Sequence, residues 1–506
     1  MATIAALMAV VFASTAGNLP DFRENQKASA PGADEIRTRE AAKAFALRRE
    51  SAIAMVQTDD DYPAARRAIA AILGDPMFAS LSPAEQRDVV SSAAWVEVRT
   101  GQYQAAAEYY RKAVALDPSD PDDWHRLSMA EDESGNYDAA ADALRRVLTD
   151  WPHLTDALSG GHVEGLVDHL ALQSESRLAL MQTLFDANWK REEETSSDLW
   201  YEMAVTLLER GDREGARTVI ARIGWPRPLM RLQADRRFDG LLPAEPDHVV
   251  QSLNRQIERL AVLSADNPRN LYTHNEWLDA LLQAGRNDEV IAISAGIIDR
   301  IDGSAPERPA FHDSDDENFT LKRRSDALRR AGRMDEALAV LVRASTMPEY
   351  EEPNVSQKLS LAELYNGLLR PDDAMEAVRE LGVTAGKYST TRQALVRMQA
   401  ALIKGDRRKA EQLLAHIRQQ GDDTFGLQFR ALLRSGRIDE AAALFIARLR
   451  DPRKRGETLL MAQDTLDLAP LPGDVAYRRD RDVLFARSDV RAAIDAVGRV
   501  NHYDVW

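Results

Sequence analysis

The chain has 506 residues, no cysteine and a formal net charge of −16. The lack of cysteine excludes disulfides, thiolate metal sites and cysteine nucleophiles, and the negative charge argues against general binding to nucleic acid or to anionic membranes. With 44% hydrophobic and only 6% aromatic residues, the composition is typical of a helical protein rich in Ala and Leu, not of a disordered or all-β chain.

The N-terminus carries an apolar run, residues 4–16, that ends in small residues before Gly17. Residues 1–16 therefore read as a signal peptide, although no Lys or Arg precedes the run. We expect export to the periplasm, and a cytoplasmic location if the run is not a signal peptide. Because the run is shorter than the ~20 apolar residues of a bilayer span, we expect no membrane span in the mature chain. Residues 17–33 predict a flexible leader.

Helical hairpins are expected from Asp34 onward, beginning with a long helix to about Gln57. The clearest hairpins span residues 87–120 and 121–154. Six residues of the first recur 34 positions later in the second: Gly101, Tyr103, Ala106, Tyr110, Ala113 and Pro118 correspond to Gly135, Tyr137, Ala140, Leu144, Val147 and Pro152. A fixed period of this length indicates a repeated structural unit. Each Gly is expected to end a first helix in a left-handed turn, and each Pro to end a second helix.

This pattern resembles the tetratricopeptide repeat family, and Trp124 and Leu127 stand at typical positions of the second copy. The resemblance implies an all-α fold, a right-handed α-solenoid of tandem helical hairpins, possibly in two segments. It also implies that first helices line a concave groove that binds a peptide. The positions that would face that peptide give four candidate partner-binding residues: Trp95, His125, Met129 and Tyr201. For Trp95 the alternative is burial by the neighbouring hairpin.

Weaker copies of the hairpin continue along the chain. We expect an N-terminal solenoid over residues 34–242, with Pro243 and Pro246 marking a boundary. A degenerate solenoid is expected over residues 243–456, and closing helices over residues 457–506. Residues 392–455 contain fifteen Lys or Arg against seven Asp or Glu, a local charge of +8. Solvated helix faces explain this charge, and the alternatives are an anionic partner or docking against the acidic part of the same molecule.

Few residue clusters suggest chemistry. The acidic run around His312, in residues 304–318, lacks the Gly and Glu spacing of a calcium loop and predicts a solvated loop. Glu175-Ser176 and the nearby Leu-Met-Gln segment look like fragments of lytic transglycosylase motifs, but only three residues separate them, too few for that family. We therefore predict no catalytic residues, no metal site and no cofactor.

The function predicted from the sequence is a non-catalytic scaffold that binds a protein or peptide, located in the cell envelope. The alternative is a helical enzyme that acts on envelope polysaccharide, similar to lytic transglycosylases, with its residues in segments 160–188 or 304–318. A deep pocket with buried carboxylates at either segment would favour the enzyme. A groove lined by first-helix residues would favour the scaffold.

Overall fold

The computed structural model describes residues 33–58, 61–190, 196–242, 247–305, 307–312, 316–349, 354–382 and 386–505. Their contacts divide the chain into two compact units, the first ending at Asn136 and the second beginning at Tyr137. The expected signal peptide, nearly all of the expected leader, and the boundary at Pro243 and Pro246 lie outside the described residues. The predicted domain limits therefore stay predictions.

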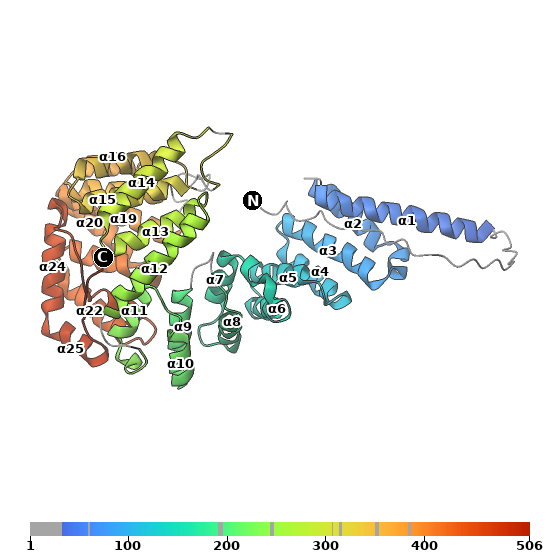
Figure 1. Ribbon diagram of the computed structural model, residues 1–506, viewed down its shortest axis with the longest axis horizontal. Helices are drawn as coiled ribbons and strands as arrows, with labels where there is room; N and C mark the ends of the chain where they lie inside the picture. The colour runs from blue at the N-terminus through green and yellow to red at the C-terminus, as the bar shows by residue number, and fades with distance from the viewer. Residues whose placement is uncertain are drawn as a thin grey trace. The chain divides into compact units, whose positions relative to one another are not determined.

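The first unit consists of helices that alternate along the chain with short turns (Figure 1). Its elements are α1 (Ala33–Thr58), α2 (Tyr62–Leu73), η1 (Pro76–Ser80), α3 (Pro83–Arg99), α4 (Tyr103–Leu116) and α5 (Pro121–Glu133). Consecutive helices pack on each other, and the first helices α1 and α3 are also in contact. This is the arrangement of stacked helical hairpins.

Local sequence determines where these helices begin. The Ser82 side chain accepts a hydrogen bond from the Glu85 backbone, and the Glu85 carboxylate accepts one from the Ser82 backbone, so α3 starts with a capping box. Asp120 caps α5 by accepting hydrogen bonds from two backbone N–H groups of its first turn. A proline occupies the first turn of both helices, where its missing N–H removes no helical hydrogen bond.

The turn inside the first clear hairpin is a Schellman motif at Gly101. Gly101 has a φ of +71°, and the Gln102 N–H donates to the Glu97 carbonyl at 2.8 Å. A left-handed residue is favourable only without a Cβ, which explains why the repeat has glycine here. Further glycines in the turns between helices also have positive φ: Gly135, Gly211, Gly285, Gly332, Gly405 and Gly436.

The small and aromatic repeat positions form the core of the clear hairpins. Ala106, Tyr110 and Ala113 are each 0% exposed in the first unit. In the second unit the corresponding Ala140 and Leu144 are also 0% exposed. Alanine allows two helix backbones to approach closely, and the larger side chains fill the remaining space. These repeat positions therefore form the core of both hairpins.

The second unit continues the same alternation of helices. Its N-terminal half contains α6 (Tyr137–Asp150), η2 (Pro152–Ala157), α7 (Gly160–His169), α8 (Glu175–Asp186), α9 (Ser197–Glu209), α10 (Arg213–Ile220), α11 (Pro226–Ala234), η3 (Arg236–Phe238), α12 (Asp247–Asp266), α13 (Leu271–Gln283) and α14 (Asn287–Asp302). Its C-terminal half contains α15 (Glu317–Arg330), α16 (Met334–Thr346), α17 (Ser356–Gly367), α18 (Pro371–Ala377), α19 (Lys387–Ile403), α20 (Arg407–Arg418), η5 (Asp422–Thr424), α21 (Phe425–Arg434), α22 (Ile438–Leu449), α23 (Arg455–Leu460), β1 (Asp464–Thr465), η6 (Pro472–Asp474), α24 (Val475–Ala486), α25 (Ser488–Val497) and β2 (His502–Tyr503).

First helices form one layer of the second unit. Helix α13 packs against α15, α17 against α19, and α19 against α21, while second helices such as α16 and α20 pack on their outer side. The predicted all-α solenoid of helical hairpins is confirmed. The sequence does not predict the short parallel pair of β1 and β2, in which Asp464 lies opposite His502.

The turn between α17 and α18 has the same form as the glycine turns but is made by Leu369. Its φ is +58°, and the Arg370 N–H donates to the Tyr365 carbonyl at 2.8 Å. Leu369 is 51% exposed, so little packing holds its side chain. A non-glycine residue in this conformation costs roughly 1–2 kcal/mol.

We therefore expect Leu369→Gly to raise the free energy of unfolding by about 0.5–1 kcal/mol, because glycine removes most of this strain. The matched control is Gly332→Leu, in a turn with a φ of +77° and open space around the missing Cβ. The free energy of unfolding of that variant should fall by a similar amount. Chemical denaturation of both variants measures the two changes, and a loss of stability in Leu369→Gly would contradict the expectation.

The C-terminus of the second unit returns to its N-terminal half. Helix α23 packs on α11, and β2 contacts α12. The Arg499 N–H donates to the Ala234 carbonyl at 2.9 Å, and Arg453 pairs with Glu209 at 2.8 Å. Part of the basic stretch at residues 392–455 is therefore docked against acidic residues of the same molecule.

Candidate functional site

Trp95 lies on α3 and is half-buried. One part of its side chain packs against the core formed by α1, α2 and α3. The Arg126 guanidinium, from α5, lies over its ring at 5.2 Å from the centroid, a cation–π contact. Trp95 is therefore partly buried by the core, and part of its surface stays accessible to a partner.

Met129 lies one turn after Arg126 on α5 and is 45% exposed. Residues three apart on a helix share a face, so Trp95, Arg126 and Met129 form one surface, which we call the α3–α5 face. His125 is half-buried, and its burial lowers the pKa of its imidazole. It therefore presents a neutral side chain at pH 7.

A buried ion pair joins the two helices beneath this face. Asp123 is 0% exposed, and its carboxylate accepts hydrogen bonds from Arg87 Nε at 2.7 Å and from Ser91 Oγ at 2.6 Å. Ser91 lies one turn before Trp95 on α3, but it is 8% exposed and serves this internal contact. We call these contacts of Asp123 with Arg87 and Ser91 the clamp. Because they hold α3 against α5, they set the position of Trp95 relative to Arg126.

Tyr201, the fourth candidate, lies inside the second unit on α9 and is 4% exposed. The Arg231 guanidinium lies over its ring at 4.3 Å, and burial raises the pKa of its hydroxyl to about 12. A Cβ added to Gly456, at the start of α23, would come within 1.8 Å of that hydroxyl oxygen. The chain's own C-terminal part therefore covers Tyr201, which does not line an open groove.

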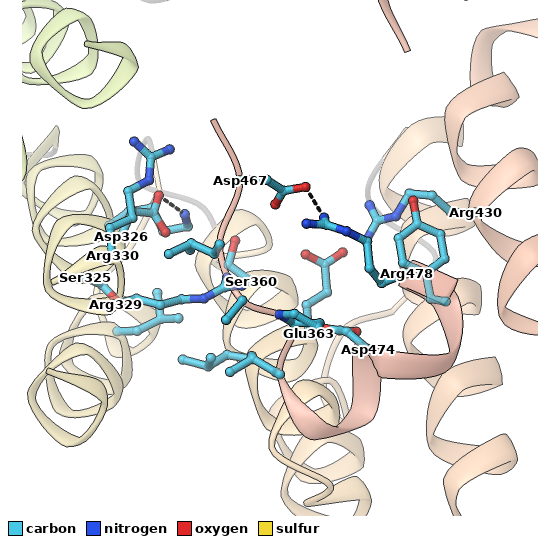
Figure 2. A pocket seen from close by; sticks show the side chains of 18 of the residues that line it. Ser325, Asp326, Arg329, Arg330, Ser360, Glu363, Arg430, Asp467, Asp474 and Arg478 are labelled. Carbon is cyan, nitrogen blue, oxygen red and sulfur yellow. Dashed lines mark hydrogen bonds and ion pairs between the residues drawn. The ribbon is translucent and has the colours of Figure 1, made fainter. Parts of the chain in front are cut away.

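A cavity of about 500 Å³ lies on the first-helix layer of the second unit (Figure 2). We call it the inner-face cavity. Helices α15, α17, α19 and α21 contribute charged side chains, and residues 467–478 close another side. Seven cationic and four acidic residues line it: Lys322, Arg329, Arg330, Arg392, Arg430, Arg434 and Arg478, with Asp326, Glu363, Asp467 and Asp474.

The acidic residues of the cavity each pair with one of the cations. Glu363 accepts two hydrogen bonds from Arg392 at 2.9 and 2.8 Å. Burial opposes ionisation of Glu363, but these bonds keep its pKa below the usual range. Lys322 pairs with Asp326 at 2.5 Å. The remaining pairs are Arg434 with Asp474 and Arg478 with Asp467.

The wall of the cavity is an extended segment, residues 466–474, which we call the wall segment. Its Leu471 packs with the apolar side chains of α16 and α17. A Cβ added to Gly367 would lie 2.6 Å from a methyl group of Leu471, and one added to Gly473 would lie 2.2 Å from the Asn366 carbonyl oxygen. The wall segment therefore lies directly on α17 and occupies part of the first-helix surface.

The family model for the tetratricopeptide repeat matches the chain twice, over residues 57–121 and 91–155. The chain is a tetratricopeptide repeat protein. Repeats of this kind present extended surfaces for binding other proteins, so the architecture supports a protein-interaction scaffold. None of the curated proteins matches the chain.

Solved structures share only a distant likeness with this tetratricopeptide repeat protein. One is titled a structure of Naa15/Naa10 bound to HypK-THB, with 15% identity over 79% of this chain and 68% of that chain and a TM-score of 0.23. Yeast Tom70 has 12% identity over 87% and 97%, with a TM-score of 0.31. The APC/C hetero-tetramer Cut9-Hcn1 has 11% identity over 91% and 83%, with a TM-score of 0.34. These likenesses are too weak to carry an argument.

The acidic insertion of this repeat protein differs partly from the expected solvated loop. Glu317 is 6% exposed and pairs with Arg343 at 2.5 Å, and burial raises its pKa. The neighbouring Asp313 and Asp315 lie outside the described residues. Across the described ranges, no group of three or more His, Asp or Glu side chains is placed to hold a metal ion. No described helix is both long and apolar enough to cross a bilayer.

None of the cavity residues is among the candidate site residues predicted from the sequence. The one relevant signal in the sequence is the basic stretch at residues 392–455, which contains Arg392, Arg430 and Arg434. Arg329 and Arg330 of α15 and Arg478 of α24 fall outside that stretch, as does the wall segment. Only the stacking of first helices brings these distant segments together.

Proposed function

We propose that this tetratricopeptide repeat protein is a non-catalytic scaffold in the cell envelope that binds a protein or peptide partner through the α3–α5 face. The observation that carries the proposal is the half-buried Trp95 under Arg126, beside the exposed Met129. Aromatic residues, Arg and Met are the residue types enriched in protein interfaces. All three occur together on adjacent first helices.

The geometry makes Trp95 suited to act as an anchor. Its ring is already held by the core and by Arg126, so binding a partner would cost little side-chain entropy. A large aromatic side chain that a partner can cover completely is the usual centre of a binding hot spot. The nearest atoms of Arg126 and Asp122 are 3.9 Å apart, and a guanidinium has five N–H donors, so Arg126 can also donate to an acidic or carbonyl group of the partner.

Trp95→Ala is expected to weaken partner binding by roughly 30-fold or more, because hot-spot truncations cost about 2 kcal/mol or more. Met129→Ala should weaken it more modestly and, because Met129 is exposed, without loss of core packing. The matched control is Leu47→Ala, which removes a 58% exposed apolar side chain elsewhere in the first unit. Calorimetric titration with the partner measures the three affinities.

The partner for this titration comes from capture on the mature chain, using fractionated cells of the source organism, so that one experiment reports both compartment and partner. Export is supported only by the apolar N-terminal run, and recovery of the chain from the cytoplasmic fraction would contradict it. Loss of cooperative melting in Trp95→Ala, together with unchanged binding by Met129→Ala, would place Trp95 in a purely structural role.

The alternative of an enzyme acting on polysaccharide gains no support from the two segments proposed for it. Glu175 begins α8, its side chain is 86% exposed, and it pairs with Arg210 at 2.9 Å. A glycosidic general acid flanks the scissile bond opposite a second carboxyl group, whereas the Glu175 carboxylate lies on the solvent-exposed surface and is paired with an arginine. The inner-face cavity is lined by first-helix residues and the C-terminal segment, not by residues 160–188 or 304–318.

A further inference from the structure

We propose that the inner-face cavity is a binding site for a compact polyanion whose charge lies on carboxylate or phosphate oxygens. This site is independent of the α3–α5 face, because the two lie in different units and share no residue. The inference rests on the cavity's unbalanced charge, on the geometry of its arginines and on the wall segment that limits its length.

The charge of the cavity is not balanced by its own residues. Seven cations face four carboxylates, and Arg329 and Arg430 take no part in the four ion pairs. The guanidinium groups of Arg329 and Arg430 make no hydrogen bond or ion pair with any described residue. A recess with this excess of positive charge focuses its field and concentrates anions.

The arginines are placed to surround a ligand. Figure 2 shows Arg329 and Arg330 on one side of the cavity and Arg430 and Arg478 on the other, with Glu363 and Asp474 between them. Each guanidinium presents a planar fork of N–H donors that matches two oxygens of a carboxylate or phosphate. A ligand with two or more charged groups can therefore contact both sides at once.

Arg434 provides a further donor at the cavity wall. Its side chain is 9% exposed and pairs through Nη2 with Asp474 at 2.8 Å, but its buried Nε has no hydrogen-bond partner among the described residues. A buried donor without a partner costs free energy. An anion in the cavity would supply an acceptor for this N–H.

The wall segment argues for a compact ligand and against an extended peptide. Leu471 rests on α17 beside Gly367, and Asp474 accepts hydrogen bonds from Arg434 at 2.8 Å and from Gln399 at 3.4 Å. These contacts occupy the first-helix surface that a peptide lying along the layer would need. The remaining volume, about 500 Å³, is within the range usual for small-molecule pockets.

The test is calorimetric titration of the full chain at pH 7 and constant ionic strength, with pyrophosphate in one arm and citrate in the other. At least one should bind roughly ten-fold or more tightly than acetate, because each added charged group can form further charge-assisted hydrogen bonds with the arginines. The arm that binds more tightly distinguishes phosphate from carboxylate ligands.

Variants connect this binding to the cavity. Arg430→Gln and Arg329→Gln, which break no observed ion pair, should each weaken binding by roughly ten-fold. Arg408→Gln on α20 is the matched control, since Arg408 is exposed, lies outside the cavity and undergoes the same charge change. Arg408→Gln should bind pyrophosphate and citrate with the same affinity as the unchanged chain.

Three results would overturn the proposal. The first is that neither probe binds more tightly than acetate. The second is an equal loss of affinity in Arg408→Gln, which would show that the anions respond only to net charge. The third is that a Glu-rich peptide binds in an Arg430-dependent manner while both small anions fail, which would assign the cavity to an acidic protein segment instead.

Discussion

Gly498→Ala is expected to lower the free energy of unfolding of the second unit by about 3 kcal/mol, because inserting a methyl group into a filled space costs roughly 1–3 kcal/mol or more. A Cβ at Gly498 would lie 2.4 Å from the Ala234 carbonyl oxygen and 2.7 Å from both methyl groups of Leu459. The carbonyl belongs to the backbone of α11 and cannot rotate away. The C-terminal segment would therefore have to move off α11.

Two backbone hydrogen bonds report on this movement. The Arg499 N–H donates to the Ala234 carbonyl at 2.9 Å, and the Leu466 N–H donates to the Val505 carbonyl at 2.9 Å. Both amides should exchange with solvent faster in Gly498→Ala. Chemical denaturation gives the free energy, and hydrogen exchange measured by mass spectrometry locates the change.

The matched control is Gly296→Ala, in the interior of α14 of the same unit. Nothing lies within 4 Å of the added Cβ, and alanine favours a helix interior over glycine by about 0.5–1 kcal/mol. This variant should gain stability, so the same chemical change has opposite signs at the two sites. A neutral result at Gly498 would mean that the C-terminal segment contributes nothing to the closure of the unit.

Asp123→Ala is expected to lower the free energy of unfolding of the first unit by roughly 3–5 kcal/mol, the usual loss when one partner of a buried ion pair is removed. Arg87 Nε and Ser91 Oγ would both lose their acceptor. Arg87 keeps contacts with Asp88 and Asp120, so the loss should fall at the lower end of this range. Thermal and chemical denaturation of the variant measure the change.

The neighbouring carboxylate provides the comparison. Asp122 directly precedes Asp123 in the chain, but its side chain is 73% exposed. Its contact with Arg126 is long, with 3.9 Å between the nearest atoms. Asp122→Ala should change stability by no more than about 0.5 kcal/mol, as is usual for surface positions. Equal losses in the two variants would show that burial of Asp123 does not determine its contribution. Because the clamp positions α3 against α5, Asp123→Ala should also weaken binding at Trp95.

Much of the fold follows from short-range rules in the sequence. Gly101 and Gly332 take left-handed conformations that only glycine adopts at low cost, and Ser82 and Asp120 cap the helices that follow them. Such features depend on a few neighbouring residues, and the 34-residue period repeats them along the chain. Leu369 shows the limit of these rules, because it forms the same turn without the glycine that would indicate it.

The candidate site is harder to predict from such short-range rules. Position within the repeat placed Trp95 and Met129 on the first helices α3 and α5, but it did not indicate the contact with Arg126 and could not show that Tyr201 is covered. Tyr201 is buried because Gly456, more than 250 residues later in the chain, lies against its hydroxyl. Repeat position describes contacts with the next hairpin, whereas burial here comes from a segment outside the repeat pattern.

The helical hairpins, their turns and the tetratricopeptide repeat are predictable from local sequence, because each depends on residues within one period of one another. The tertiary structure alone decided the return of the C-terminus to α11, the burial of Tyr201 and the position of the wall segment on α17. It also decided the inner-face cavity, whose residues span Lys322 to Arg478. These features depend on how curvature accumulates over many stacked hairpins, and small rotations at each hairpin leave no local signal in the sequence.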